Sequence, residues 1–282
     1  MTAPVARLSC FFGADLAAVR RCERGGFVVR FGSKMSSHIQ YQAQAGVATL
    51  RMQRPEKKNA LTFAMYQALI EGLDRANADD DVRAVVLLGS DSVFTAGNDI
   101  GDFINGSQGG GDLGLPIRFL QVLSSFRKPL VAGVSGLAIG IGTTMLLHCD
   151  LVYASASARF RTPFADLGLT PEGGSSLLLP ALVGPRGAAQ WLLLGDEFSA
   201  EGARDAGLLN AVVPDAEVAA LEAAARLAKK PPGAILAAKE LMKRATAAQV
   251  AEVLVAEGAV FAERLRSQEA MAALLAFRNK AK

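Results

Sequence analysis

The stretch Leu130–Thr144, which reads LVAGVSGLAIGIGTT, decides the fold class of this 282-residue chain. Its first five residues, Leu130–Val134, form a continuous apolar run directly after a proline, which is typical of a strand buried on both faces. A glycine-rich turn follows, and the apolar run Gly140–Cys149 then predicts a helix. A buried strand, a glycine-rich turn and a helix in this order are typical of α/β proteins.

The alternation of strands and helices extends on both sides of this stretch. Val47–Met52 alternates apolar and polar residues like an edge strand, whereas Ala84–Leu88 is a second apolar run and predicts a buried strand. Between them, Thr62 can cap a helix whose apolar residues recur at helical spacing. Two further strands are expected at Leu151–Ala154 and Ala211–Val213, and a further helix includes Trp191–Leu194. We therefore expect an α/β core with mostly parallel pairing of strands.

Beyond Pro214 the pattern changes to helices with no strand between them. Four helices are expected, at Glu217–Lys229, Gly233–Arg244, Ala248–Leu265 and Glu269–Asn279. The pair Pro231–Pro232 is a natural boundary. We therefore divide the chain into an extension (1–34), an α/β core (35–230) and a helical C-terminal region (231–282). The alanine-rich, amphipathic C-terminal region is expected to pack in an oligomer contact or against its own core.

The first 34 residues differ in charge from the rest of the chain. They hold six basic and two acidic residues, whereas the remainder is nearly neutral. We expect a mis-assigned start, with Met35 as the true first residue, or a transit peptide, and we assign this extension no function. The nearly neutral body argues against a nucleic-acid-binding surface.

The composition excludes several other classes of protein. Hydrophobic residues make up 51% of the chain and charged residues 20%, which supplies a large core and argues against disorder. Three widely spaced cysteines favour a reducing compartment over a disulfide framework, and two histidines make no metal cluster. No run of 18 uninterrupted apolar residues occurs, so no membrane span is predicted. Without a clear targeting signal, the expected location is the cytoplasm.

Three stretches carry residues suited to chemistry. Phe94–Ile100 is a turn of small residues that would let a ligand approach the backbone, although an ordinary turn has the same composition. Gly136–Thr144 exposes N–H groups at a helix start, where they bind negative charge, but it lacks the third glycine of a dinucleotide fingerprint. In Phe160–Ser176, burial would raise the pKa of Glu172 and make it a usable base, while a solvated loop glutamate is the alternative.

These three stretches, in this order and spacing, resemble the crotonase (enoyl-CoA hydratase/isomerase) superfamily. The block Arg54–Leu61, which reads RPEKKNAL, resembles the first conserved block of that family. The resemblance covers residues 39–282 and implies a spiral of ββα units with a helical C-terminal region. It also implies assembly as a homotrimer or as a hexamer made of two trimers, and a small-molecule acyl-CoA thioester as the substrate.

The resemblance assigns roles to particular residues. Two backbone N–H groups hold the thioester oxygen in this family, and their positions fall on Asn98 and Ile141. The further contacts implied for CoA and substrate fall on Glu56, Lys57, Lys58, Ala60, Ala96, Gly97, Asn98, Asp99, Ile100 and Gly140, and those implied for the acyl pocket on Phe103, Thr144 and Phe164. The glycine- and asparagine-rich stretch Ile104–Pro116 corresponds to a region that helps to cover the acyl tail, and its composition predicts mobility or a surface insertion.

The departures from the family pattern favour one branch of it. A typical hydratase activates water with two glutamates, and this chain has Thr144 and Phe164 at the corresponding positions. The run from Thr162 to Ser176 resembles the peroxisomal type of Δ3,Δ2-enoyl-CoA isomerase, in which the position of Glu172 is the single catalytic base. Such an enzyme moves a double bond through a dienolate. It needs no metal and no redox cofactor, since the acyl-CoA is itself the substrate.

Two other interpretations remain open at this point. The chain could be another crotonase-type enzyme, either a hydratase with unusual residues or an isomerase for a ring-containing acyl-CoA, with Asp166 as a second carboxylate. It could also be a non-catalytic acyl-CoA-binding scaffold, although the presence of Glu172 argues against that.

Overall fold

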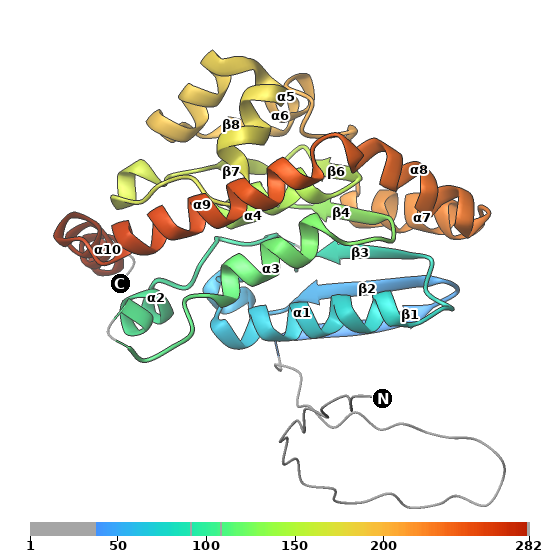
Figure 1. Cartoon of the computed structure of the whole chain (residues 1–282), viewed down its shortest axis with the longest axis horizontal. Coiled ribbons are helices and arrows are strands. Elements are labelled where there is room, and N and C mark those ends of the chain that lie inside the picture. Colours follow the sequence, from blue (N-terminus) through green and yellow to red (C-terminus); the bar gives the residue numbers. More distant parts are fainter. Residues whose placement is uncertain (1–37, 91, 108, 281–282) are drawn as a thin grey trace, which may run out of the picture. The chain divides into compact units, whose positions relative to one another are not determined.

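The computed structural model describes residues 38–90, 92–107 and 109–280, and the predicted extension at 1–34 lies outside them (Figure 1). The main sheet has six strands in the order β1-β2-β3-β4-β6-β9, which are Ile39–Gln44, Val47–Met52, Ala84–Leu88, Leu130–Val134, Leu151–Ser155 and Ala211–Val213. β1 and β2 pair antiparallel, and every later pair in this sheet is parallel. The mostly parallel pairing expected from the sequence is therefore confirmed.

The position of β2 in the sheet corrects the sequence-based expectation. The strand forms where it was predicted, but it is not an edge, because it pairs with β1 on one side and β3 on the other. Its alternation has another cause. One face packs in the core through Ala48, Leu50 and Met52, while the opposite face is half-buried and carries Arg51, which forms a two-pronged ion pair with Glu217. The polar strand β1 occupies the edge.

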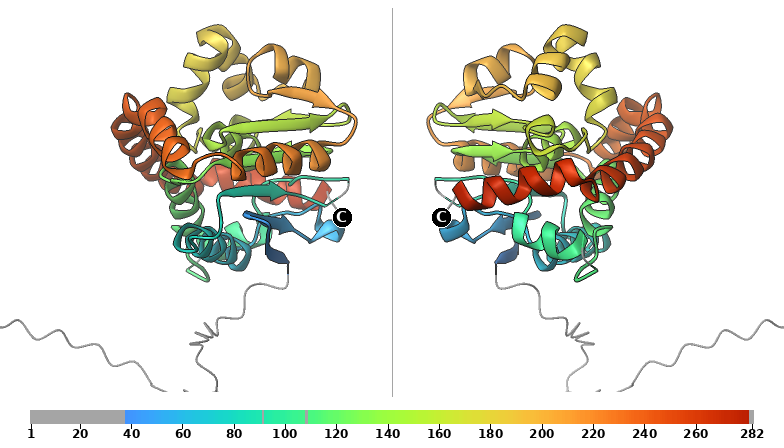
Figure 2. Two further views of the ribbon diagram at one scale, coloured as in Figure 1. Left: turned by 90° about the vertical axis from the view of Figure 1, so that its right-hand side faces the viewer. Right: turned by 90° about the vertical axis from the view of Figure 1, so that its left-hand side faces the viewer.

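Helices cover both faces of the main sheet (Figure 2). α1 (Phe63–Ala78) and α3 (Leu115–Ser124) pack on one face, and α7 (Ala216–Ala228) packs against β3, β4 and β6 on the other. β3 and β4 are consequently buried along their whole length, as their apolar runs predicted. The cap predicted for α1 is also present, because the Thr62 side chain accepts a hydrogen bond from the Met65 N–H at 3.2 Å.

A second, smaller sheet lies beside the glycine-rich stretch. It contains β5 (Leu137–Ile139), β7 (Arg159–Arg161) and β8 (Phe198–Ser199), with β5 and β7 parallel. The long helix predicted at 140–149 is instead a short α-helical turn, α4 (Ile141–Thr144), that continues as the 3-10 turn η2 (Met145–His148). In this turn the N–H groups of Thr143 and Thr144 donate to the Gly140 carbonyl, whereas the N–H of Ile141, its first residue, has no partner within the helix.

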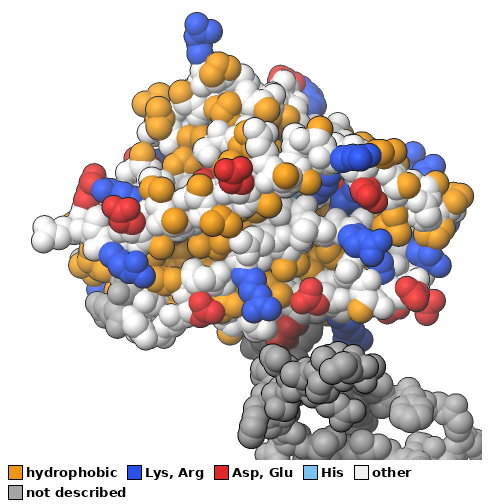
Figure 3. Space-filling view, viewed as in Figure 1, with side chains coloured by type: hydrophobic (Ala, Val, Ile, Leu, Met, Phe, Trp, Pro, Cys, Tyr) orange, Lys and Arg blue, Asp and Glu red, His pale blue; other side chains and the backbone are white. Residues whose placement is uncertain are grey.

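The helical C-terminal region forms as predicted, with boundaries shifted by one residue. α8 (Pro232–Arg244), α9 (Ala247–Leu265) and α10 (Gln268–Lys280) follow one another, and α9 packs on α3 and α5. Apolar side chains remain exposed on α8, α9 and the helical stretch 175–194; they include Leu182, Leu193, Leu194, Leu241, Met242, Val255 and Val260. Figure 3 shows hydrophobic side chains spread over one face of the molecule. The oligomer contact expected of this region stays a prediction.

The helical stretch 175–194 consists of α5 (Ser175–Ala189) and the π-helical turn η4 (Gln190–Leu194). By length and composition it is apolar enough to cross a membrane, with a mean hydropathy of 1.3, and the pair α8–α9 passes the same test only across a 62° bend. Gly184, with φ 75° and ψ 162°, interrupts α5. The stretch is therefore two pieces, each shorter than the roughly 20 residues that a span requires.

The remaining short elements are η1 (Pro55–Lys57), α2 (Ile100–Ser107), η3 (Ala165–Leu167) and α6 (Ala200–Asp205).

Candidate active site

The loops that follow β3 and β4 meet at one edge of the main sheet. Because the two strands are parallel neighbours, their carboxyl ends point to the same side. The Thr95 N–H donates to the Leu137 carbonyl at 2.9 Å, and the Ile139 N–H donates back to the Thr95 carbonyl at 3.0 Å. The turn at 95–98 therefore runs beside the glycine-rich stretch, so two of the three stretches identified in the sequence share one place in the fold.

Two glycines permit this close approach. Gly97 has φ +88°, and a Cβ added there would lie 2.7 Å from the Ile139 carbonyl oxygen. A Cβ on Gly142 would lie 2.6 Å from the Thr95 side chain. Real Cβ atoms do not approach other atoms so closely, so a larger residue at either position would force the neighbouring atoms to shift. The sequence predicted a close backbone approach here, although it assigned that approach to a ligand.

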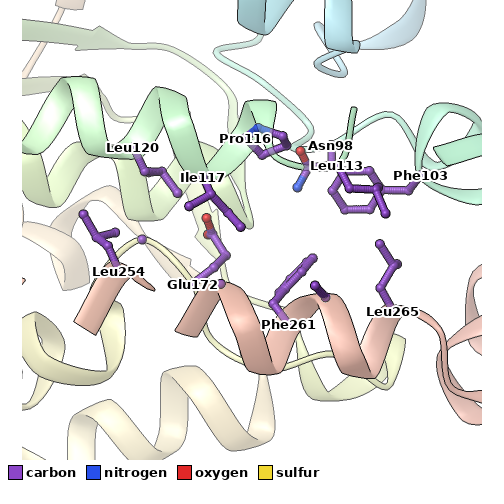
Figure 4. Close-up of a pocket in the computed structure, with 13 residues that line it drawn as sticks. Asn98, Phe103, Leu113, Pro116, Ile117, Leu120, Glu172, Leu254, Phe261 and Leu265 are labelled. Carbon is purple, nitrogen blue, oxygen red and sulfur yellow. The ribbon is translucent and has the colours of Figure 1, made fainter. Parts of the chain in front are cut away.

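The two predicted N–H donors lie at the ends of these segments. Ile141 is the first residue of α4, where an N–H has no partner within its own helix. Asn98 follows Gly97, and its side chain lines the pocket drawn in Figure 4. The hydroxyl of Tyr66, a buried residue of α1, donates a hydrogen bond to Asn98 Oδ1. Burial and the nearby Glu172 carboxylate raise the Tyr66 pKa, so this hydroxyl keeps its proton.

The turn at 54–60 is fastened to the loop at 96–100. Arg54 Nη1 donates to Asp99 Oδ2 at 2.7 Å and to the Ala60 carbonyl at 2.9 Å. Asn59 is fully buried, and its amide group donates to the Val93 and Phe94 carbonyls at 2.9 and 3.1 Å. Sequence reasoning placed Asn59 in a motif but missed this fastening role. The predicted CoA contacts at 56–58 are exposed, and Ala60, Ala96, Asp99, Ile100 and Gly140 are partly exposed along the same edge.

Glu172 lies at the base of an apolar pocket and is only 6% exposed. The Thr144 hydroxyl donates a hydrogen bond to Glu172 Oε1. Burial raises the Glu172 pKa to about 8; the hydrogen bond from Thr144 opposes that shift and the carboxylate of Glu257 adds to it. A carboxyl group that titrates near neutral pH can take up a proton and return it. The structure therefore excludes the solvated loop glutamate considered from the sequence.

The loop that carries Glu172 is held by residues from two other elements. His148, in η2, is buried, and its Nε2 lies 2.8 Å from the Gly173 carbonyl oxygen. Burial lowers the His148 pKa to about 4, so the neutral imidazole donates this hydrogen bond. Glu257, in α9, accepts hydrogen bonds from the N–H groups of Gly174 and Ser176. No local pattern in the sequence points to Glu257, since 85 positions separate it from Glu172.

The pocket itself is lined mainly by α3, α9 and the segment between α2 and α3 (Figure 4). Phe103 lines it as the sequence predicted, and Thr144 contacts the carboxylate at its base. Phe164 is not among the lining residues that the structure describes, because it is buried at the start of η3. Leu113 and Pro116 lie in the stretch that the resemblance expects to cover the acyl tail. The apolar lining that the sequence missed comprises Ile117, Leu120, Leu254, Phe261, Ala262 and Leu265.

Two further expectations need correction. Ile104–Pro116 is not wholly a loop, because α2 continues to Ser107 and α3 begins at Leu115. Leu113 of this stretch lines the pocket, in agreement with the expected cover for the acyl tail. Asp166, considered as a second carboxylate, is exposed and pairs with Arg161 at 2.8 Å on the surface. Within the described ranges, no three histidine, cysteine or acidic side chains gather as a metal site would require.

Comparison with known proteins gives this arrangement a family. The enoyl-CoA hydratase/isomerase family profile matches residues 42–282. The chain belongs to the enoyl-CoA hydratase/isomerase family. It is 35% identical over 249 residues to enoyl-CoA delta isomerase 2 of Rattus norvegicus, and the match covers 86% of this chain. It is also 36% identical over 214 residues to a probable enoyl-CoA hydratase of Rhodobacter capsulatus, covering 73% of this chain and 81% of that one.

Comparison with solved structures confirms the crotonase-like fold predicted from the sequence. The structure of Pseudomonas aeruginosa OdaA matches with a TM-score of 0.83 and 45% identity, over 86% of this chain and 99% of that one. The chain spans only 63% of the length of the rat isomerase. The relatives of this chain thus include an isomerase and a probable hydratase. The choice between the two activities therefore depends on which residues are present in the site.

Proposed function

We propose that this protein is a Δ3,Δ2-enoyl-CoA isomerase, which moves the double bond of an acyl-CoA thioester from C3 to C2. The proposal rests on one observation: among the described residues that line the pocket, Glu172 is the only ionisable side chain. The likeness to the rat delta isomerase supports the same activity. No second carboxylate lies in the lining to hold and activate water.

In the proposed reaction, one carboxylate transfers a proton between two carbon atoms. The ionised Glu172 removes a proton from C2 of the 3-enoyl-CoA, and the electron pair of that C–H bond delocalises onto the thioester oxygen as a dienolate. The backbone N–H groups of Asn98 and Ile141 stabilise the negative oxygen, as donors aimed at developing charge do in other enzymes. Protonated Glu172 then gives its proton to C4, and the trans-2-enoyl-CoA forms.

Hydration is the alternative that the relatives raise, because one of them is a probable hydratase. The positions that resemble the two hydratase glutamates hold Thr144 and Phe164. The hydroxyl of Thr144 donates a hydrogen bond to Glu172, and Phe164 is buried and not among the described residues that line the pocket. Neither side chain can act as the second acid or base that water addition requires. The role of a non-catalytic acyl-CoA-binding scaffold is disfavoured for a different reason. Glu172, the candidate base, is present, buried in the pocket and hydrogen-bonded to Thr144.

The pH dependence of isomerisation tests the single-base mechanism. The Glu172 pKa is raised to about 8, so the active carboxylate is the minor form below that pH. We expect kcat/KM for 3-hexenoyl-CoA to rise with pH and to level off above a midpoint near 8, because kcat/KM reports ionisations of the free enzyme. A profile measured from pH 6 to 10 that stays flat would contradict the assignment of Glu172 as the base.

A further inference from the structure

Glu257 is a buried carboxylate outside the reacting groups and comes from a distant part of the chain. It belongs to α9 and is 8% exposed. Its Oε2 accepts a hydrogen bond from the Gly174 N–H at 2.6 Å, and its Oε1 accepts one from the Ser176 N–H at 2.8 Å. Both carboxylate oxygens of Glu257 thus accept hydrogen bonds from the segment that begins at Glu172.

The loop has few means of its own to fix its conformation. Gly173 and Gly174 are consecutive residues with φ +73° and +71°, a region that glycine adopts freely. Gly174 is also the N-cap of α5, and no side-chain hydrogen bond from a cap residue is present there. The carboxylate of Glu257 takes the place of that cap and meets the N–H groups at the positive end of the helix.

α9 has a second contact with the same site. Gly258, the residue next to Glu257, lines the pocket together with Leu254 and Phe261 of the same helix. Figure 4 shows the carboxylate of Glu172 between α3 and α9. The helix that forms one wall of the pocket therefore also holds the loop that carries the proposed base.

We propose that Glu257 is a positioning residue, which fixes the Glu172 loop through two backbone hydrogen bonds and places a carboxylate beside the base of the pocket. This inference rests on the proposed function, in which Glu172 is the base. Glu257 touches no reacting atom. Its effect on the reaction passes through the orientation and the charge of Glu172.

The electrostatic part of the proposal depends on the other groups that face Glu172. From α1 comes Tyr66, whose raised pKa keeps it neutral, and from η2 comes His148, whose pKa of about 4 makes it neutral above pH 5. Thr144 of α4 donates a hydrogen bond, and α3 contributes only apolar side chains to the pocket. The charge that acts on the pKa of Glu172 comes from the carboxylate of Glu257, and a like charge raises the pKa of a carboxyl group.

The experiment compares Glu257→Gln with Glu252→Gln, which removes an exposed charge from the same helix. In Glu257→Gln, we expect the kcat/KM plateau to fall by about 10- to 100-fold, as small misplacements of a catalytic group do. We expect the midpoint of the pH profile to move to lower pH, because the like charge is gone. The loss of kcat/KM in Glu257→Gln relative to the wild type should therefore be larger at pH 9.5 than at pH 6.5. Glu252→Gln should keep both the plateau and the midpoint of the wild type.

A folded Glu257→Gln variant with the wild-type midpoint and plateau would overturn the proposal. If this variant does not fold, Glu257→Asp replaces it, because aspartate keeps the charge but is shorter. For Glu257→Asp we expect an unchanged midpoint and a lower plateau, and a wild-type plateau would again overturn the proposal. Failure of the underlying function is recognised separately, since Glu172→Gln would then retain its activity whatever Glu257 does.

Discussion

Replacing Glu172 with glutamine is expected to lower kcat for isomerisation of 3-hexenoyl-CoA by about 10²- to 10⁴-fold, the range typical of positioned acid–base groups. The loss should lie at the upper end, because one carboxylate performs both proton transfers. Glutamine keeps the size of the side chain and can still accept the hydrogen bond from Thr144. The fold and the binding of substrate should therefore change little, and KM should stay near the wild-type value.

The matched control for this variant is Asp166→Asn, which removes the other carboxylate considered from the sequence. Asp166 lies on the surface and pairs with Arg161, so its loss should leave kcat near that of the wild type. Steady-state assays of both variants separate the two carboxylates. If Asp166→Asn lost its isomerase activity and Glu172→Gln kept it, the single-base mechanism would be wrong.

Gly97→Ala is expected to lower kcat/KM by about 10²- to 10³-fold, comparable to the removal of one oxyanion donor. The new Cβ would meet the Ile139 carbonyl oxygen at 2.7 Å, so the turn has to move away from the glycine-rich stretch. That movement displaces the N–H of Asn98 relative to that of Ile141. Kinetics on 3-hexenoyl-CoA measure the effect, together with thermal unfolding to confirm that the variant is folded.

Gly184→Ala separates backbone strain from displacement of the donor. Gly184 has φ +75°, similar to Gly97, but nothing lies within 4 Å of a Cβ added there. Both variants place an alanine at positive φ, and Gly184, with ψ 162°, lies in a region that essentially only glycine adopts, so each carries a strain of roughly 1–3 kcal/mol. We expect Gly184→Ala to lose stability and keep its kcat/KM. Equal losses of kcat/KM in the two variants would show that strain alone explains the effect at Gly97.

The parts of the site that the sequence predicts are those that a short run of residues determines. The apolar runs at 84–88 and 130–134 fix two buried parallel strands, and the glycines after them fix where the chain can approach itself. Glu172 stood out because it is a carboxylate in a glycine-rich, apolar loop. Its burial was an expectation from the sequence, and the structure supplies the pocket that causes it.

The parts that the sequence does not predict depend on contacts between distant elements. Tyr66 and Glu257 reach the site from α1 and α9, and their own helices look amphipathic whether or not a buried polar group is needed. The apolar lining of the pocket from α3 and α9 follows the ordinary helical pattern of a core. The alternation in β2 indicates an edge strand for a related reason, since a half-buried face beside α7 has the same pattern as a solvent-facing edge.

The most direct test of the account supplies the wild-type protein with 3-hexenoyl-CoA and, separately, with 2-hexenoyl-CoA in ¹⁸O-labelled water. We expect the first to be converted to trans-2-hexenoyl-CoA without ¹⁸O, and the second to show little hydration, because the pocket lining offers one carboxylate and no partner for water. Rapid formation of ¹⁸O-labelled 3-hydroxyhexanoyl-CoA from 2-hexenoyl-CoA, persisting in Glu172→Gln, would contradict the account and would require water to be activated by other residues.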